Sequence, residues 1–288
     1  MEPRHGRVQC LSPAGFHRVA YVEWGDPGNP RVLVCVHGLT RSGRDFDYLA
    51  QSLSDRYRVV CPDVVGRGMS DWLRDPRHYA MPQYAADMIT LLARLNVESV
   101  DWLGTSMGGM IGMVLAAQPE SPIRRLILND VGPVIAAGAL ARISEYLATP
   151  PSFASLDQAE AYIRHVAAPF GKLSDAQWRH LTENVVKLGP MGTLAMHYDP
   201  AIAAAFNAAM QAQGEWRDVE LWPLYDAIRC PTLVIRGETS DLLSREVTAQ
   251  MAARGPCAQI VEVSGVGHAP MFLDDAQVDI VKNYLQAA

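Results

Sequence analysis

Residues 104–109, with the sequence Gly-Thr-Ser-Met-Gly-Gly, constrain the fold of this chain more than any other stretch. They follow a short apolar run at 100–103 and precede a helix-like run at 110–117. A serine flanked by glycines in this context is typical of a sharp strand-to-helix turn with a strained serine backbone. In so tight a turn, a Cβ at Gly104 or Gly108 would collide with neighbouring backbone. The new helix also aims its first amides at the turn, where an anion can be stabilised.

Short apolar runs alternate with helical patterns along most of the chain, which predicts an α/β fold with a mostly parallel sheet covered on both faces. Such continuous runs of Val, Leu, Ile and Cys are typical of strands buried on both faces. The opening segment at 8–11 is expected to form an antiparallel edge strand. The other expected strands are 19–24, 32–37, 59–62, 100–104, 126–130, 232–237 and 259–263. The expected helices are 46–53, 84–95, 108–117, 245–253 and 275–285.

The alternation stops between residues 133 and 225, where the chain is Ala-rich, helix-prone and punctuated by prolines. Because this stretch lies between two expected strands, we expect it to form a helical cap over the carboxyl ends of the sheet. The core is then 1–132 with 226–288, and the cap is 133–225. Its expected helices are 138–147, 156–166, 176–188 and 202–212.

Length and composition exclude several classes of protein. A chain of 288 residues suffices for one α/β domain with an insertion. The net charge of -6 argues against nucleic-acid and anionic-membrane surfaces, because both need a basic face. The 5 cysteines are scattered, and no apolar leader or membrane-length apolar stretch is present. We therefore expect a cytoplasmic protein, monomeric or homodimeric, without nucleic-acid or membrane partners. The 8 histidines show no metal-ligand spacing, so we expect neither metal nor cofactor.

A serine hydroxyl is a poor nucleophile at neutral pH and needs a base, which in turn needs an orienting acid. Asp241 comes shortly after the expected strand at 232–237, and His268 follows the strand at 259–263 in a glycine-containing loop. The order Ser106, Asp241, His268, with each residue after a different strand, predicts that the three meet at one rim of the sheet. We expect Ser106 to attack, His268 to accept and return the proton, and Asp241 to orient the imidazole.

The identity of the acid has alternatives. Asp130 also follows an expected strand and is the replacement if Asp241 does not fill the role. Otherwise Asp130 would cap or brace the hinge of the cap. Glu238 is the local competitor of Asp241 and is expected at the surface.

An oxyanion at the turn would need two backbone donors. The amide of Met107 is one candidate, because it follows the serine at the start of a helix. Leu39 is the other, because His37-Gly38-Leu39 ends an apolar strand where a donor loop should begin. His37 is expected to hold that loop by hydrogen bonds rather than to take part in chemistry.

These motifs together resemble those of the α/β-hydrolase fold serine hydrolases. The resemblance spans the chain outside the cap and rests on His37-Gly38, residues 63–71, 104–109 and 236–241, and Gly267-His268. It implies a mostly parallel eight-stranded sheet flanked by helices, the catalytic triad, and a helical cap after the sixth strand. Serine at the turn differs from the aspartate of haloalkane dehalogenases and epoxide hydrolases. Neither the lipase HGGG loop nor the Gly-Pro-Gly loop of C–C hydrolases is present, so bacterial carboxylesterases, lactonases and haloperoxidase-like esterases remain.

We therefore expect hydrolysis of a small or medium carboxylic ester or lactone through an acyl-enzyme on Ser106. The alternatives are a C–C bond hydrolase of a dienol or β-diketone, and a ligand receptor without turnover. Arg41 could pair with a substrate carboxylate or, within its own loop, with Asp45. Side chains that could line an apolar pocket, or simply pack, include Phe170, Met196 and Trp222.

Overall fold

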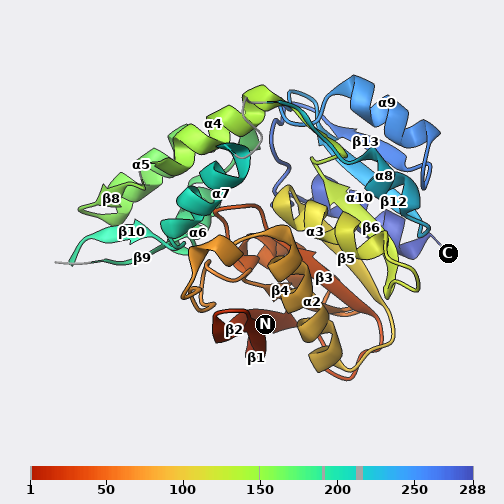
Figure 1. The fold of residues 1–288 in the computed structure, drawn as a ribbon, viewed down its shortest axis with the longest axis horizontal. Helices are drawn as coiled ribbons and strands as arrows, with labels where there is room; N and C mark the ends of the chain where they lie inside the picture. Colours follow the sequence, from red (N-terminus) through yellow and green to blue (C-terminus); the bar gives the residue numbers. More distant parts are fainter. Residues whose placement is uncertain (1, 149, 190–191, 212–216, 288) are drawn as a thin grey trace.

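The centre of the molecule is an eight-stranded sheet in the order β1-β2-β4-β3-β5-β6-β12-β13 (Figure 1). The computed structural model describes residues 2–148, 150–189, 192–211 and 217–287. β2 pairs antiparallel with β1 and β4, whereas the other neighbours in the sheet are parallel. The mostly parallel sheet and its antiparallel edge strand are thus confirmed. The strands are β1 Arg4–Ser12, β2 Gly15–Trp24, β3 Val32–Val36, β4 Arg58–Pro62, β5 Val100–Thr105, β6 Ile123–Asn129, β12 Thr232–Gly237 and β13 Gln259–Val263.

Helices cover both faces of this sheet, and β3 shows why. Val32, Val34 and Val36 belong to a core cluster that includes residues of α2 (Met81–Leu95) and α3 (Met107–Ala116). Leu33 and Cys35 point the other way, into a cluster with residues of α1 (Asp47–Leu53) and α10 (Asp275–Gln286). Because side chains alternate along a strand, a fully apolar run is what burial on both faces requires. The helices around the sheet are α1 Asp47–Leu53, α2 Met81–Leu95, α3 Met107–Ala116, α9 Arg245–Ala253 and α10 Asp275–Gln286, with short 3-10 helices at Gly43–Phe46 and Pro76–His78. Within the described ranges, no helix has the length and apolarity needed to cross a lipid bilayer.

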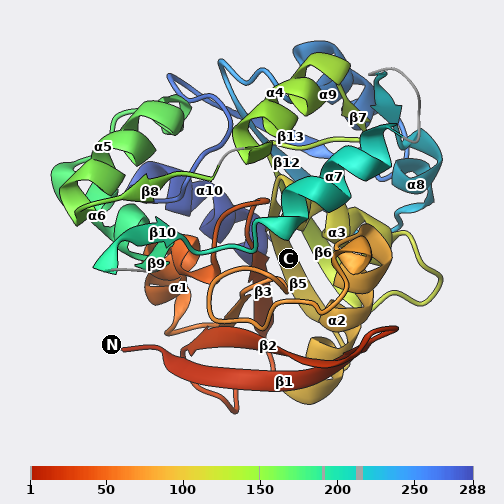
Figure 2. The same ribbon diagram turned by 60° about the vertical axis from the view of Figure 1, so that its left-hand side comes forward.

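Between β6 and β12 the chain leaves the sheet for residues 133–225, which we call the insert. Figure 1 shows α4 to α7 of the insert to one side of the sheet, and Figure 2 shows them as two pairs, α4 with α7 and α5 with α6. Its helices are α4 Ala137–Ala148, α5 Leu156–Val166, η3 Ala168–Phe170, α6 Asp175–Glu183 and α7 Ala201–Gln211. A further helix, α8 Trp222–Ala227, begins in the insert and ends in the core. The insert also holds short strands that the sequence analysis did not predict: β7 Val134–Ile135, β8 Ser152–Phe153, β9 Val186–Leu188, β10 Leu194–Met196 and β11 Val219–Glu220.

The helix expected at 176–188 is therefore too long. It ends at Glu183, and β9 follows because residues 186–188 pair with β10. This pairing is made with residues farther along the chain, so helical periodicity alone could not reveal it. The expected helix at 202–212 matches α7, except that Ala212 lies outside the described residues.

Among the described residues, backbone hydrogen bonds attach the insert to the core at two places. The amide of Gly68 donates to the carbonyl of His197 (2.9 Å), and that of Asp199 donates to Gly66 (2.8 Å). On the other side, the amide of Gly267 donates to the carbonyl of Pro169 (2.7 Å). The second attachment lies next to His268, so the insert directly supports the loop that carries this histidine.

Candidate active site

Ser106 lies at the turn between β5 and α3 with φ 53° and ψ -116°, a conformation that non-glycine residues rarely adopt. The flanking glycines make the turn possible. A Cβ on Gly104 would lie 2.2 Å from the backbone of Gly108, and one on Gly108 would lie 2.0 Å from the carbonyl oxygen of Val36. The strained turn and the need for glycine at both positions are as expected from the sequence.

The loop after β3 lies beside this turn. A Cβ on Gly38 would be 3.8 Å from the Cβ of Ser106. Leu39 directly follows Gly38, and Met107 is the first residue of α3, where helix amides lack intrahelical partners. Leu39 and Met107, the two expected oxyanion donors, thus directly follow Gly38 and Ser106, which lie close together.

A completely buried arginine, Arg67, holds these two residues together. Its Nε donates to the carbonyl of Leu39 (2.8 Å), and its Nη2 lies 3.5 Å from the sulfur of Met107. Its Nη1 donates to the carbonyl of Val65 (2.8 Å) and to the hydroxyl of Tyr84 (3.0 Å). This role was not predicted, because the sequence around Arg67 does not indicate which groups the guanidinium contacts.

His37 is a structural neighbour of the donor loop. Its Nδ1 donates to the carbonyl of Gly38 (2.6 Å), and its Nε2 accepts the amide of Val64 (2.9 Å). Burial lowers the pKa of His37 to about 3, with smaller contributions from Arg67 and Arg41. A neutral His37 that bridges two loops agrees with the expectation that it holds the donor loop in place.

His268 makes its acid contact with Asp130. The Nδ1 of His268 lies 2.8 Å from Oδ2 of Asp130, whose side chain has no exposed surface. Asp130 also accepts the amide of Gly237 (2.8 Å) and the hydroxyl of Ser240 (2.6 Å), so its orientation is fixed. A Cβ on Gly237 would lie 2.2 Å from the carbonyl oxygen of Gly267, which explains glycine at the end of β12.

The expected contact between Asp241 and His268 is not the one found. Asp241 forms an ion pair with Arg142 of α4 instead, and both side chains are about half exposed, at 51% each. Asp130 directly follows β6, and its φ of 52° turns the chain there. Its contacts with Gly237, at the end of β12, and with Ser240 hold its carboxylate beside His268. The carboxylate in contact with His268 is thus Asp130, the alternative to Asp241 named from the sequence. Glu238 is half-buried and accepts bonds from Ser264 and Gly265 in the loop before His268.

Ser106 and His268 line a cavity of about 420 Å³, within the range of small-molecule sites. The sheet side contributes the loop after β3, including Leu39 and Arg41. The insert contributes apolar and aromatic side chains and one arginine, among them Arg142, Ile143, Tyr146, Ile163 and Phe170.

Arg41 and Phe170 line this cavity, as the sequence analysis allowed. Arg41 is paired with Asp45 through two hydrogen bonds (2.8 and 2.6 Å), which is the local pairing named as its alternative. Met196 and Trp222 are not among the lining residues. Met196 is buried in β10, and the ring of Trp222 packs edge-on against Tyr225.

The sequence analysis missed the contribution of α4. Arg142 and Tyr146 are one turn apart and so share a face of this helix. The hydroxyl of Tyr146 lies 3.4 Å from that of Thr40, beside the expected oxyanion loop. Helical periodicity predicted α4 but could not show which of its faces meets the cavity.

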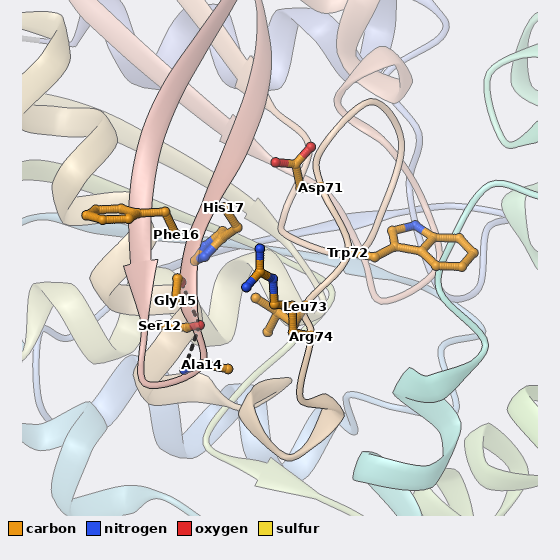
Figure 3. Close-up of a pocket in the computed structure, with 9 residues that line it drawn as sticks. All are labelled: Ser12, Ala14, Gly15, Phe16, His17, Asp71, Trp72, Leu73 and Arg74. Atoms are coloured by element: carbon orange, nitrogen blue, oxygen red, sulfur yellow. Dashed lines mark hydrogen bonds between the residues drawn. The ribbon is translucent and has the colours of Figure 1, made fainter.

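A second cavity, of about 290 Å³, lies between the β1–β2 turn and residues 71–74 (Figure 3). It shares no lining residue with the cavity of Ser106. His17 lines this cavity, and its Nε2 lies 3.0 Å from Oδ2 of Asp87. Cys10, His17 and Asp87 form the one group of possible metal ligands among the described residues. Asp87 is also bonded to Gln83 (2.7 Å), so hydrogen bonds within the fold already engage this carboxylate.

Comparison with known proteins identifies relatives over the full chain. The sequence profile of the alpha/beta hydrolase family matches residues 33–281. A 3-hydroxybutyrate-oligomer hydrolase from Cupriavidus necator is 53% identical over 99% of this chain and 99% of its own. Among solved structures, a Rickettsia typhi protein has a TM-score of 0.91 at 32% identity, with 100% of both chains covered. An alpha/beta hydrolase from Novosphingobium aromaticivorans has a TM-score of 0.86 at 35% identity, again with 100% of both chains covered.

Proposed function

Because this chain belongs to the alpha/beta hydrolase family, we propose that it is a serine hydrolase that cleaves the ester bonds of short 3-hydroxybutyrate oligomers. The observation that carries the proposal is the contact between His268 and the buried Asp130, made at the cavity that also holds the strained Ser106. Nucleophile, base and orienting acid are the parts that acyl transfer requires.

In the proposed reaction, Asp130 accepts the Nδ1 proton of His268 in a hydrogen bond and leaves Nε2 free as the base. Nε2 takes the proton of Ser106 while Oγ attacks the ester carbonyl carbon. The amides of Leu39 and Met107 stabilise the resulting oxyanion, each donor contributing about 3 kcal/mol to the transition state. The C–O ester bond then breaks, and the departing alkoxide takes the proton from His268.

Water completes the cycle. His268 removes a proton from a water molecule, whose oxygen attacks the acyl carbon bound to Ser106. Collapse of the second oxyanion releases the carboxylic acid and returns the proton to Ser106. The chemistry needs no metal or cofactor, because each proton passes between groups of the chain, the substrate and water.

The substrate class rests on the relative from Cupriavidus necator and on the cavity. Identity of 53% over nearly the whole of both chains supports a shared substrate class. A cavity of about 420 Å³ with apolar and aromatic lining suits short aliphatic esters better than a polymer chain. In this proposal, the carboxylic ester expected from the sequence is the ester bond of a 3-hydroxybutyrate oligomer.

The insert has the place of a cap in this proposal. Ile143, Tyr146 and Phe170 close the cavity from the insert side, while Ser106 and His268 face it from the core. The division into a core of residues 1–132 and 226–288 and a cap of residues 133–225 belongs to the same proposal. So does a cytoplasmic location, which the free thiols of all five cysteines support.

The test is hydrolysis of the dimer and trimer of 3-hydroxybutyrate, with p-nitrophenyl esters of increasing chain length in parallel. We expect turnover of the oligomers and a preference for short p-nitrophenyl chains, with both activities lost in Ser106→Ala. Failure of folded wild-type protein to cleave any ester would overturn the proposal. Turnover of dienols or β-diketones would then identify a C–C hydrolase, and ligand binding without turnover would identify a receptor.

A further inference from the structure

Two arginines line the cavity of Ser106, and the ion pairs that they form differ in burial. Arg41 is bound by Asp45 through two hydrogen bonds, and the side chains are only 13% and 6% exposed. Breaking this pair would leave a buried charge without a partner, which is strongly unfavourable. Arg41 is therefore not available to a ligand.

Arg142 has a different environment. It comes from α4 of the insert and pairs with Asp241 of the core, and each side chain is 51% exposed. Water screens a pair of this exposure, so it contributes little to stability and can exchange partners. Both residues line the same cavity as Ser106. An anionic ligand can therefore displace Asp241 and bind the guanidinium of Arg142.

The chemistry of a hydroxy-acid oligomer fixes where such an anion would lie. Each ester joins the carbonyl of one unit to the oxygen of the next, so the free carboxylate is always on the alcohol side of every ester bond. The free hydroxyl is always on the acyl side. A cation that holds the terminal carboxylate therefore holds the leaving group, not the acyl group on Ser106.

We propose that Arg142 binds the terminal carboxylate of the oligomer in exchange for Asp241, so that hydrolysis starts from the carboxyl end. This inference rests on the proposed function. A planar guanidinium suits a carboxylate because it can form two parallel hydrogen bonds with it. In the step that follows, the bond from Ser106 Oγ to the carbonyl carbon forms and the ester C–O bond breaks. The leaving alkoxide takes the proton held by His268 and departs as the carboxyl-terminal hydroxy acid.

The first experiment compares three forms of the 3-hydroxybutyrate trimer: the free acid, its methyl ester and its O-acetyl derivative. For wild type we expect kcat/KM for the free acid to exceed that for the methyl ester at least tenfold. Acetylation of the hydroxyl end should have little effect. With deuterium in the hydroxyl-terminal unit, the first monomer released should be unlabelled, as measured by mass spectrometry at early times.

Variants of Arg142 and Asp241 then test whether this ion pair causes the preference for the free acid. Arg142→Gln should lose the preference for the free acid through a higher KM, and Arg142→Lys should restore part of it. Asp241→Asn should lower the KM for the free acid, because the competing carboxylate is removed. The matched control is Arg77→Gln, which breaks a surface pair with Asp75 outside this cavity and should behave as wild type.

The outcomes separate this inference from the proposed function. Equal kcat/KM for the acid and the methyl ester, a labelled first monomer, or an unchanged preference in folded Arg142→Gln would overturn it while ester hydrolysis stands. Absence of turnover on the trimer and on p-nitrophenyl butyrate by folded wild type would overturn both. Melting temperatures of the variants establish that each one is folded.

Discussion

The Nδ1 atom of His268 lies 2.8 Å from Oδ2 of Asp130, a carboxylate fully enclosed at the end of β6. Because Asp130 also accepts bonds from Gly237 and Ser240, it holds the imidazole in one orientation. In the proposed mechanism, this bond places the Nδ1 proton toward Asp130 and leaves Nε2 to accept the proton of Ser106. This relationship determines which carboxylate mutation should abolish the proposed activity.

Replacing Asp130 by Asn should lower kcat on p-nitrophenyl butyrate by about 10³–10⁴-fold, because an amide favours the wrong imidazole tautomer. The fold-decrease in kcat caused by Asp241→Asn should be at least about 100 times smaller than that caused by Asp130→Asn. The reason is that Asp241 pairs with Arg142 rather than with His268. Steady-state kinetics on both variants, with circular dichroism to verify folding, makes the comparison. The reverse ranking would return the acid role to Asp241.

Replacing Arg67 by Met should lower kcat by about 10–100-fold with a smaller change in KM, because the loop of Leu39 loses its anchor. The rate of the acylation burst with p-nitrophenyl acetate measures this directly. Tyr84→Phe is the matched control, since it removes a neighbour of Arg67 but keeps the bond to Leu39. If the burst rate of correctly folded Arg67→Met equals that of wild type, Arg67 does not position the oxyanion loop.

Replacing Gly108 by Ala should destabilise the fold by about 3 kcal/mol or more, because the new Cβ would lie 2.0 Å from the carbonyl oxygen of Val36. Gly138→Ala is the control. Gly138 is in α4 with nothing within 4 Å of its Cβ position, and alanine there should stabilise by up to about 1 kcal/mol. Denaturant unfolding of both variants tests the contrast, and equal effects would contradict the geometry of the turn.

The contribution of His37 to stability should depend on pH. Its pKa is about 3 in the fold and 6.5 as the reference value, so the unfolded chain binds a proton first as pH falls. The stabilisation is complete above about pH 6.5 and is lost as the pH falls toward 3. The stability difference between wild type and His37→Gln should therefore narrow by about 2 kcal/mol from pH 7 to pH 5. Urea unfolding at both values provides the measurement, and a constant difference would show that His37 is not held neutral by the fold.

Much of the sheet could be predicted because its strands are short apolar runs that leave few alternatives. β12 and β13 have the expected bounds, and the edge strand β1 was expected over residues 8–11, the later part of Arg4–Ser12. The strands of the insert were not predicted, because their pairing depends on residues elsewhere in the chain. β8, β9 and β10 are two or three residues each, too short to carry a period of their own.

Those parts of the candidate site that have a local sequence signature could be predicted. The turn at Ser106 and the histidine loop have local signatures, whereas the choice between Asp130 and Asp241 depends on the paths of the loops that carry them. Strand order alone would favour Asp241, because β12 is the neighbour of β13. Both aspartates follow a strand, and only the three-dimensional arrangement shows that Ser240 and Gly237 bind Asp130. Arg142 was missed for the same reason, since its place at the cavity depends on which face of α4 meets it.

The most direct measurement is acid-quenched mass spectrometry of the protein mixed with the 3-hydroxybutyrate trimer, run beside the steady-state rate of Ser106→Ala. We expect a transient hydroxyacyl adduct on the peptide that contains Ser106. The rate of Ser106→Ala on the trimer should be at least about 10⁴-fold below that of wild type. Trimer hydrolysis retained by pure, folded Ser106→Ala, or an adduct on another residue, would contradict it.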